Sequence, residues 1–126
     1  MSLDIKVTKK MDYVYMVELA GSLDVETHQL LDAELKELID DKTKAVILDM
    51  ASLEYISSIG IRTVIWAKKA LKEKDASFSM INFQPQIKKV FEAMKILPMF
   101  NIFDNMPEAD MYIDQMIKDE MRKTAQ

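Results

Sequence analysis

The 126-residue sequence contains no cysteine, one histidine, two glycines and three prolines. Without cysteine the chain has no disulfide, no thiolate metal site and no cysteine nucleophile, which agrees with a cytoplasmic location. Two glycines are too few for a glycine-rich loop that binds phosphate. The lone histidine, His28, has no cysteine or carboxylate spacing around it that predicts a metal site, so we interpret it as a partly buried packing residue.

The sequence also lacks an excess of positive charge and lacks long apolar runs. The formal net charge is −4 and the pI is near 5.0, which argues against direct binding of nucleic acid, because that needs a basic surface. No run approaches the roughly 18 apolar residues of a membrane-spanning helix and no N-terminal signal pattern is present, so we expect no membrane insertion. A composition of 49% hydrophobic and 30% charged residues predicts one globular domain over residues 1–126.

Apolar residues repeat with strand and helix periods in turn along the chain. The strand patterns cover residues 3–7, 13–20, 45–50 and 77–83, with a short fifth candidate at 101–104. The helix patterns cover residues 25–41, 60–74, 85–97 and 107–123, and Asp24 is placed to cap the first of them. This order predicts an α/β fold with a mixed four- to five-stranded β-sheet and about four helices, mostly covering one face.

The stretch 45–62, AVILDMASLEYISSIGIR, joins the most apolar run of the sequence to a polar turn. Residues 45–50 predict a strand buried on both faces, which is usual between parallel neighbours. Ser57 and Ser58 stand just ahead of the predicted helix start at Gly60, where backbone N–H groups lack partners and the helix dipole is positive. One interpretation is that a serine caps this helix and does nothing else. The other is that Ser58 is phosphorylated, which would change the surface charge without unfolding the domain.

The predicted helix 60–74 turns one face to the core and leaves Ile59, Arg62 and Trp66 on the other. An exposed tryptophan beside an arginine is typical of the centres of protein interfaces. The alternative is that Trp66 packs beneath a neighbouring loop. No base and orienting acid lie near Ser58 in the sequence, and adjacent carboxylates elsewhere fit solvated helix ends, so we expect no catalytic residues and no enzyme activity.

Four segments in order carry a family resemblance: Gly21-Ser22-Leu23-Asp24, the strand VILDM, the turn YISSIGI, and the segment MINFQPQIKKVFEAMKILPMFNIFDN. Together they resemble the STAS domain of bacterial anti-sigma factor antagonists, from about residue 4 to residue 117. The resemblance implies a domain that binds an anti-sigma factor which is also a serine kinase, and so releases the sigma factor. Phosphorylation of one serine by that kinase breaks the complex, and a phosphatase reverses it. The kinase brings ATP and magnesium, so no cofactor is expected for this chain.

By this resemblance Ser58 falls on the phosphorylated serine. Asp24 falls on the aspartate of a turn that lies close to that serine, while Gly60 and Ile61 match the glycine and leucine that follow it. The implied partner-binding residues are Asp24, Ser57, Ser58, Ile59, Arg62 and Trp66.

Some of these positions depart from the family pattern. Ser57 stands where the family usually has aspartate, which makes Ser57 a second candidate for phosphorylation. Ile59 replaces a small residue, and Trp66 stands where many members keep a small one, so the implied partner surface is bulkier and more apolar. Arg62 replaces a second glycine and either pairs with a phosphate on Ser58 or stays exposed without a specific role. These departures imply a divergent anti-sigma kinase as the partner.

Two other functions stay open at this point. The first is a STAS-like module whose serine is never modified, acting as a scaffold or as a subunit of a transporter or signalling assembly. The second is a small-ligand-binding domain that uses a methionine-rich groove near the last helix, where methionines recur at Met106, Met111, Met116 and Met121. The pattern also leaves the oligomeric state open.

Overall fold

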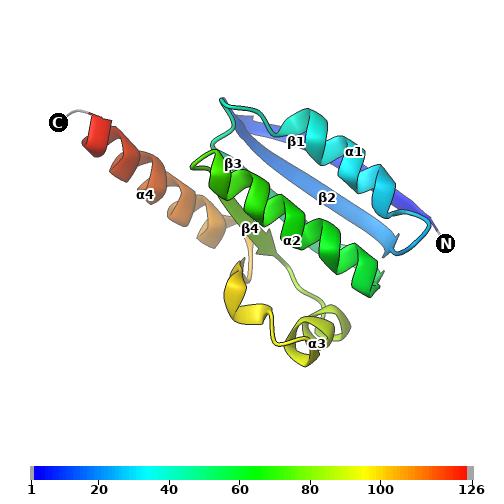
Figure 1. The fold of residues 1–126 in the computed structure, drawn as a ribbon. Helices are drawn as coiled ribbons and strands as arrows, with labels where there is room; N and C mark the ends of the chain where they lie inside the picture. Colours follow the sequence, from blue (N-terminus) through cyan, green and yellow to red (C-terminus); the bar gives the residue numbers. More distant parts are fainter. Residues whose placement is uncertain (1, 125–126) are drawn as a thin grey trace.

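The computed structural model describes residues 2–124 and contains, within them, five strands and four α-helices (Figure 1). Strands and helices alternate after an initial pair of strands. In chain order the elements are β1 (Leu3–Met11), β2 (Val14–Leu23), α1 (His28–Leu38), β3 (Ala45–Ile56), α2 (Ser58–Glu73), β4 (Ser77–Ile81), α3 (Pro85–Ala93), a short 3-10 helix (Leu97–Met99), β5 (Asn101–Phe103) and α4 (Met106–Thr124).

The strands form one mixed sheet in the order β1-β2-β3-β4-β5. β1 and β2 are antiparallel because a tight hairpin joins them, whereas β2, β3, β4 and β5 run parallel. Each parallel connection contains a helix, as a crossover between parallel strands requires. β3 lies in the middle of the sheet and its residues 45–48 are all buried, which explains the continuous apolar run in the sequence. The predicted mixed α/β sheet is therefore confirmed.

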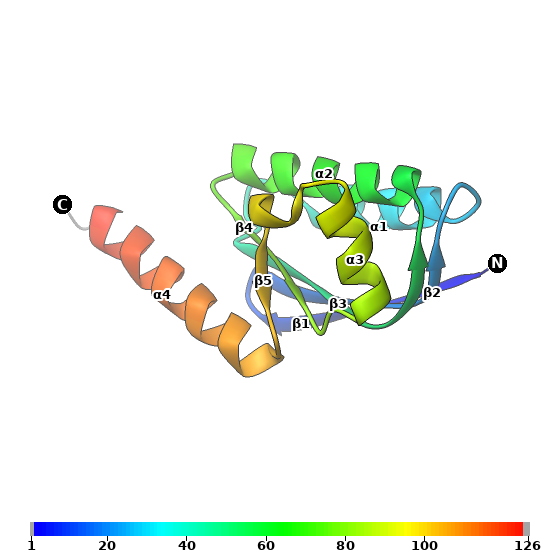
Figure 2. The same cartoon turned by 90° about the horizontal axis from the view of Figure 1, so that it is seen from below.

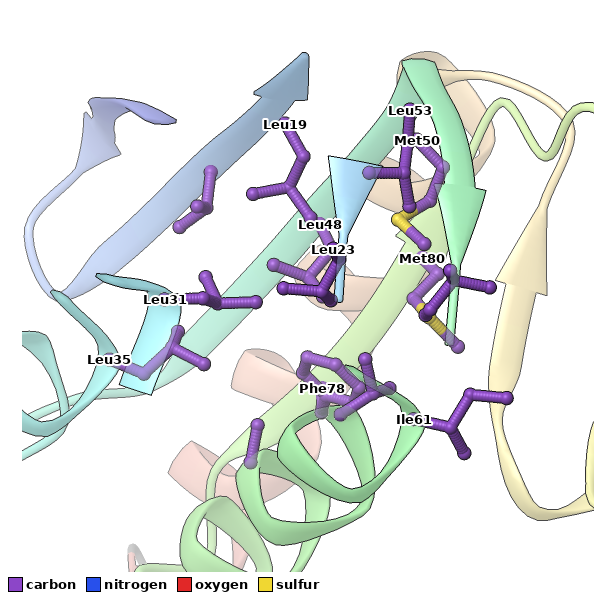
Figure 3. Close-up of a cluster of buried hydrophobic side chains, with 14 of the residues drawn as sticks. Leu19, Leu23, Leu31, Leu35, Leu48, Met50, Leu53, Ile61, Phe78 and Met80 are labelled. Carbon is purple, nitrogen blue, oxygen red and sulfur yellow. The ribbon is translucent and has the colours of Figure 1, made fainter. Parts of the chain in front are cut away.

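The helices divide unequally between the two faces of the sheet. Ile47 and Leu48 are neighbours on β3 and so point to opposite faces. Leu48 joins the main core, which α1 and α2 cover with residues such as Leu31 and Ile61, and to which α3 also contributes (Figure 3). Ile47 joins a smaller cluster formed with Ile113 of α4. Figure 2 shows α1 and α2 along one face and α4 on the other side, so the prediction that most helices cover one face is confirmed.

Several element boundaries differ from the prediction. α1 starts at His28 rather than at residue 25, because the preceding backbone is held in a turn by the Asp24 carboxylate. β3 continues to Ile56 instead of ending at residue 50. α3 ends at Ala93 rather than at residue 97, and the following residues form the short 3-10 helix. The elements themselves all occur in the predicted order.

Candidate functional site

The two candidate serines lie where β3 passes into α2, at the end of the sheet where β2 also finishes (Figure 1). Leu23 and Ile56, the last residues of β2 and β3, are register partners. The Ser57 N–H donates to the Leu23 carbonyl oxygen at 2.9 Å. β2 therefore fixes the point at which the chain leaves the sheet, and with it the position of both serines.

Ser57 is the N-cap residue of α2. Its backbone is extended (φ −93°, ψ 172°), its Oγ accepts a hydrogen bond from the Gly60 N–H at 3.3 Å, and its carbonyl oxygen accepts one from the Ile61 N–H at 3.0 Å. The side-chain bond satisfies a backbone N–H that the start of a helix otherwise leaves without a partner. The residue is half-buried. The interpretation that one serine caps this helix is confirmed for Ser57.

Ser58 is the first residue of α2, which therefore starts earlier than the predicted position at Gly60. Ser58 is exposed, and within residues 2–124 its hydroxyl makes no hydrogen bond. It lies at the positive end of the helix dipole, where an added negative charge is favourable. The two neighbouring hydroxyls therefore differ in their roles: that of Ser57 is used by the fold, and that of Ser58 is available to a second molecule.

Gly60 allows α2 to begin close to the sheet. A Cβ atom built on this residue would lie 2.7 Å from the Leu23 carbonyl oxygen and 3.0 Å from Ile56 Cγ1. These distances are shorter than an ordinary carbon contact of about 3.5–4 Å, so a larger residue would push the helix away from β2 and β3. Glycine is required here by this close approach, and it holds Ser58 at the edge of the sheet.

Asp24 organises the turn between β2 and α1. Its Oδ1 accepts hydrogen bonds from the N–H groups of Glu26 at 3.0 Å and Thr27 at 3.1 Å. Thr27 Oγ1 accepts from the Asp24 N–H at 3.0 Å and donates to the Ser22 carbonyl oxygen at 2.7 Å. Asp24 is only 8% exposed, so its carboxylate mainly holds this turn. The prediction that Asp24 caps α1 is wrong in detail, because the N-cap residue is Thr27 and Asp24 caps the turn before it.

A groove of about 300 Å³ lies between α1 and α2. Trp66 lines it and is half-buried, with the Lys36 ammonium 5.7 Å from the centre of its ring. His28, also half-buried as predicted, has its Nδ1 3.3 Å from Asp32 Oδ2. Trp66 therefore packs toward α1 and not beneath a loop. The residues lining this groove, called here the α1–α2 groove, are His28, Asp32, Lys36, Ile59, Arg62, Thr63 and Trp66.

The α1–α2 groove brings together Ile59, Arg62 and Trp66, which the helical period places on one face of α2. Asp24, Ser57 and Ser58 do not line it. The α1 residues of the groove were missed by the sequence reasoning, although their spacing of four places them on one helix face. What the sequence does not show is that this face of α1 meets α2. The three α1 residues that line the groove are His28, Asp32 and Lys36.

A second groove, of about 310 Å³, lies at the opposite end of the sheet, where α4 passes the turns before β3 and β4. Met116, Ile117 and Met121 form its apolar wall, so two of the four methionines expected in a groove near the last helix line it, and Met106 and Met111 do not. At its rim the Lys74 ammonium donates to Asp41 Oδ1 at 2.6 Å, and this hydrogen bond lowers the pKa of Asp41 and raises the pKa of Lys74. Both partners are on the surface, so the pair contributes little to stability.

The described part of the chain shows neither a cluster of metal ligands nor a membrane-spanning helix. Residues 2–124 contain no group of three or more histidine, aspartate or glutamate side chains placed to hold a metal ion. Among the same residues, no helix combines the length and the apolar character that crossing a membrane requires.

Comparison with known proteins gives a family match and a curated relative. The model of the STAS domain matches residues 4–109, which include both serines and the α1–α2 groove. BtrV of Bordetella bronchiseptica, provisionally named an anti-sigma factor antagonist, is 33% identical over 57 residues. That match covers 45% of this chain and 49% of BtrV, so the chain spans about half the length of the curated relative it matches.

Solved structures share the fold at low sequence identity. An anti-sigma factor antagonist from Mycobacterium paratuberculosis matches with a TM-score of 0.79 and 18% identity, covering 90% of this chain and 95% of that one. The Bacillus cell fate determinant SpoIIAA in its phosphorylated form matches with a TM-score of 0.69 and 18% identity, covering 86% of this chain and 96% of that one. A sulfate transporter family protein from Wolinella succinogenes matches with a TM-score of 0.73 and 15% identity, covering 84% of this chain and 88% of that one. These likenesses establish the fold, which occurs in proteins with different named functions.

Proposed function

The chain belongs to the STAS domain family, and from this premise we propose that it is a phosphorylation-switched module that binds an anti-sigma factor serine kinase. With Ser58 unmodified, the chain binds the kinase, which then releases its sigma factor. Phosphorylation of Ser58 by the same kinase ends the complex, and a phosphatase restores the binding form. The chain acts by binding, while the phosphoryl transfer, the ATP and the magnesium belong to the kinase.

The observation that carries this proposal is the contrast between the two hydroxyls at the start of α2. Ser58 is exposed and its hydroxyl has no partner within residues 2–124, so it can enter a kinase active site without breaking any bond of the fold. Ser57 is half-buried and its Oγ accepts from the Gly60 N–H. A phosphate on Ser57 would replace the cap hydroxyl and disturb the helix start, so Ser58 is the better acceptor.

The position of Ser58 also allows the fold to tolerate a phosphate. The group would add about −1.5 to −2 charges at the positive end of the α2 dipole, where they are favourable. Arg62 lies one turn further along α2 and forms no ion pair in the described part of the chain. Its guanidinium is therefore free to pair with a phosphate on Ser58.

The same phosphate would separate the complex. Burying a dianion at the centre of an interface costs several kcal/mol unless the partner supplies a cation. Each ~1.4 kcal/mol weakens affinity tenfold, so the expected loss is roughly a hundredfold or more. Asp24 would support this surface by holding the β2–α1 turn in place, because its carboxylate accepts hydrogen bonds from Glu26 and Thr27 of that turn.

A second candidate function is a STAS module whose serine is not modified and which serves as a scaffold or as part of a transporter. The observation that favours it is the fold shared with the Wolinella succinogenes sulfate transporter family protein. In that case the exposed Ser58 hydroxyl would be an ordinary surface group, and kinase treatment would leave the chain unchanged.

The test is to incubate the protein with the anti-sigma factor serine kinase of the same organism and Mg-ATP, and to measure its intact mass. We expect one phosphate on the wild type and on Ser57→Ala, and none on Ser58→Ala. Ser58→Ala should still bind the kinase, whereas Ser58→Asp should bind at least about tenfold more weakly. A phosphate that disappears in Ser57→Ala instead would move the site to Ser57. The absence of phosphate from every form would favour the scaffold.

A further inference from the structure

We propose that the α1–α2 groove receives an acidic segment of the partner kinase, with an apolar side chain of that segment packed against Trp66. This inference rests on the proposed function, because it identifies where and by what chemistry the kinase docks beside Ser58. It concerns the unphosphorylated form of the chain, which is the form that binds.

The groove continues the surface that carries Ser58. Ile59, the residue after Ser58, is half-buried and lines the groove. Arg62 lies one helical turn after Ser58 and lines it as well. A partner placed over the Ser58 hydroxyl would therefore also reach the groove.

The charged groups of the groove leave positive charge without an acidic partner. Asp32 is the only carboxylate among the lining residues, and His28 Nδ1 already lies 3.3 Å from its Oδ2. Within residues 2–124 neither Lys36 nor Arg62 forms an ion pair, and the recorded contact of Lys36 is with the Trp66 ring. With His28 neutral, two cations and one carboxylate (2 − 1) give the lining residues a formal net charge of +1, whereas the whole chain carries −4. Charge complementarity therefore selects an acidic segment.

Trp66 adds an apolar wall and a further hydrogen-bond donor. Its ring packs against the edge of the main core and is half-buried, which leaves part of it open to a partner. No acceptor for its indole N–H is recorded in the described part of the chain. Carboxylates would serve the indole, the ammonium and the guanidinium as acceptors, and one apolar side chain would cover the exposed part of the ring. The side chains of a basic segment carry no acceptor for these donors, and their charge would repel Lys36 and Arg62.

Arg62 links the groove to the phosphorylation site. Residues four apart on a helix contact each other, so a phosphate on Ser58 competes with the partner's carboxylates for the Arg62 guanidinium. Phosphorylation therefore withdraws one of the two cations from the groove in addition to placing a dianion beside it. An acidic segment should lose affinity on phosphorylation even when the rest of the kinase is absent.

The experiment uses Trp66, the only tryptophan of the chain, as a fluorescent reporter of groove occupancy. The probes are two short synthetic peptides in which either glutamates or lysines flank a central leucine. We expect a saturable change with the glutamate peptide and none with the lysine peptide. Lys36→Glu and Arg62→Glu should each bind the glutamate peptide roughly fivefold to tenfold more weakly. The matched control is Lys69→Glu, an exposed α2 residue outside the groove, which should bind like the wild type.

Three results would overturn the inference: no saturable change with the glutamate peptide, equal binding of the lysine peptide, or an equal loss in Lys69→Glu. Thermal melts of each variant show that the variants are folded. Suppose that the kinase phosphorylates Ser58 and then dissociates, yet binds Lys36→Glu and Arg62→Glu as tightly as the wild type. In that case the groove inference is wrong and the proposed function stands. If the glutamate peptide binds as expected but the kinase leaves Ser58 unmodified, the kinase switch fails and the preference of the groove for acidic segments stands.

Discussion

The same hydrogen-bonded turn stands at both ends of α1, yet only one end carries the candidate site. Asp24 and Thr27 form the turn before the helix, and Asp40 and Thr43 form the turn after it. In both, the threonine Oγ1 accepts from the aspartate N–H at 3.0 Å. The aspartate Oδ1 accepts from the threonine N–H at 3.1 Å before the helix and 3.2 Å after it. The turn is therefore a unit of the fold, and the site depends on what lies beside it.

The neighbours of the two turns are different. Beside the first turn Ser58 presents an exposed hydroxyl that has no hydrogen bond within residues 2–124. Beside the second turn Lys74 and Asp41 form an ion pair, and the Asp41 side chain is 88% exposed. The hydrogen-bonded groups of the two turns are thus distinct from the Ser58 hydroxyl, which has no hydrogen bond within residues 2–124. Stability and kinase binding should respond to different substitutions at the two ends of α1.

The largest loss of stability is expected from Gly60→Ala. The new Cβ would lie 2.7 Å from the Leu23 carbonyl oxygen, so α2 must shift, which costs about 1–3 kcal/mol of the free energy of unfolding. Kinase binding should fall as well, because Ser58 moves with the helix start. Denaturant unfolding measures the first effect, and Ser58→Ala is the control, with a change below about 0.5 kcal/mol. A Gly60→Ala protein as stable as the wild type would show that α2 is not held against β2.

The two turns can be compared directly by Thr27→Val and Thr43→Val. Each substitution removes an Oγ1 that donates to a carbonyl oxygen, that of Ser22 at 2.7 Å or that of Leu38 at 3.0 Å. Each also leaves an aspartate N–H without its acceptor, so both should cost about 1–2 kcal/mol. Only Thr27→Val should weaken kinase binding, measured by calorimetry under conditions where both variants are folded. Equal losses of binding would break the distinction between the two ends.

Ser57→Ala should have a smaller effect, because it removes the α2 cap but buries no new group. The Gly60 N–H loses its acceptor, which costs about 1 kcal/mol and lowers the Tm. Ser58→Ala should leave the Tm unchanged, since that hydroxyl has no bond to lose in the described part of the chain. A larger Tm drop in Ser58→Ala than in Ser57→Ala would reverse the assignment of the two serines.

The smallest effect is expected at the pair of Asp41 and Lys74. The Lys74 hydrogen bond lowers the pKa of Asp41 in the folded protein, so the pair favours folding while Asp41 is ionised. This contribution is present above the pKa of Asp41 in the unfolded chain and is lost as the pH falls through the lowered pKa of the folded state. Because both groups are exposed, Asp41→Asn should leave the Tm at neutral pH almost unchanged and kinase binding intact. Melts of both proteins from neutral to acidic pH check this, and a large Tm drop at neutral pH would contradict it.

Local pattern was enough to predict much of this fold. The apolar run 45–50 predicts a buried central strand, and the helical period over residues 60–74 predicts that one face turns to the core, where Ile61, Val64 and Leu71 are buried. The serine pair at the start of that helix also follows from the capping preference of serine.

Local pattern gave a wrong or incomplete prediction where side-chain hydrogen bonds compete with helix formation, and where segments far apart in the sequence come into contact. Residues 25–27 have a helical pattern but form a turn, because the bonds between Asp24 and Thr27 compete with helix formation. The α1–α2 groove could not be predicted, because it requires contact between Lys36 and Trp66 on separate helices. Sequence periodicity places residues on a helix face but does not show which helix that face meets.

The most direct test of the account is to incorporate phosphoserine at position 58 and to measure Tm and kinase affinity on the same sample. We predict a Tm close to that of the unmodified protein, because the phosphate lies at the exposed, positive start of α2. We predict a kinase affinity lower by roughly a hundredfold or more. An unchanged affinity, or a loss of affinity that occurs only because the phosphorylated protein unfolds, would contradict the claim that a surface charge on Ser58 controls binding.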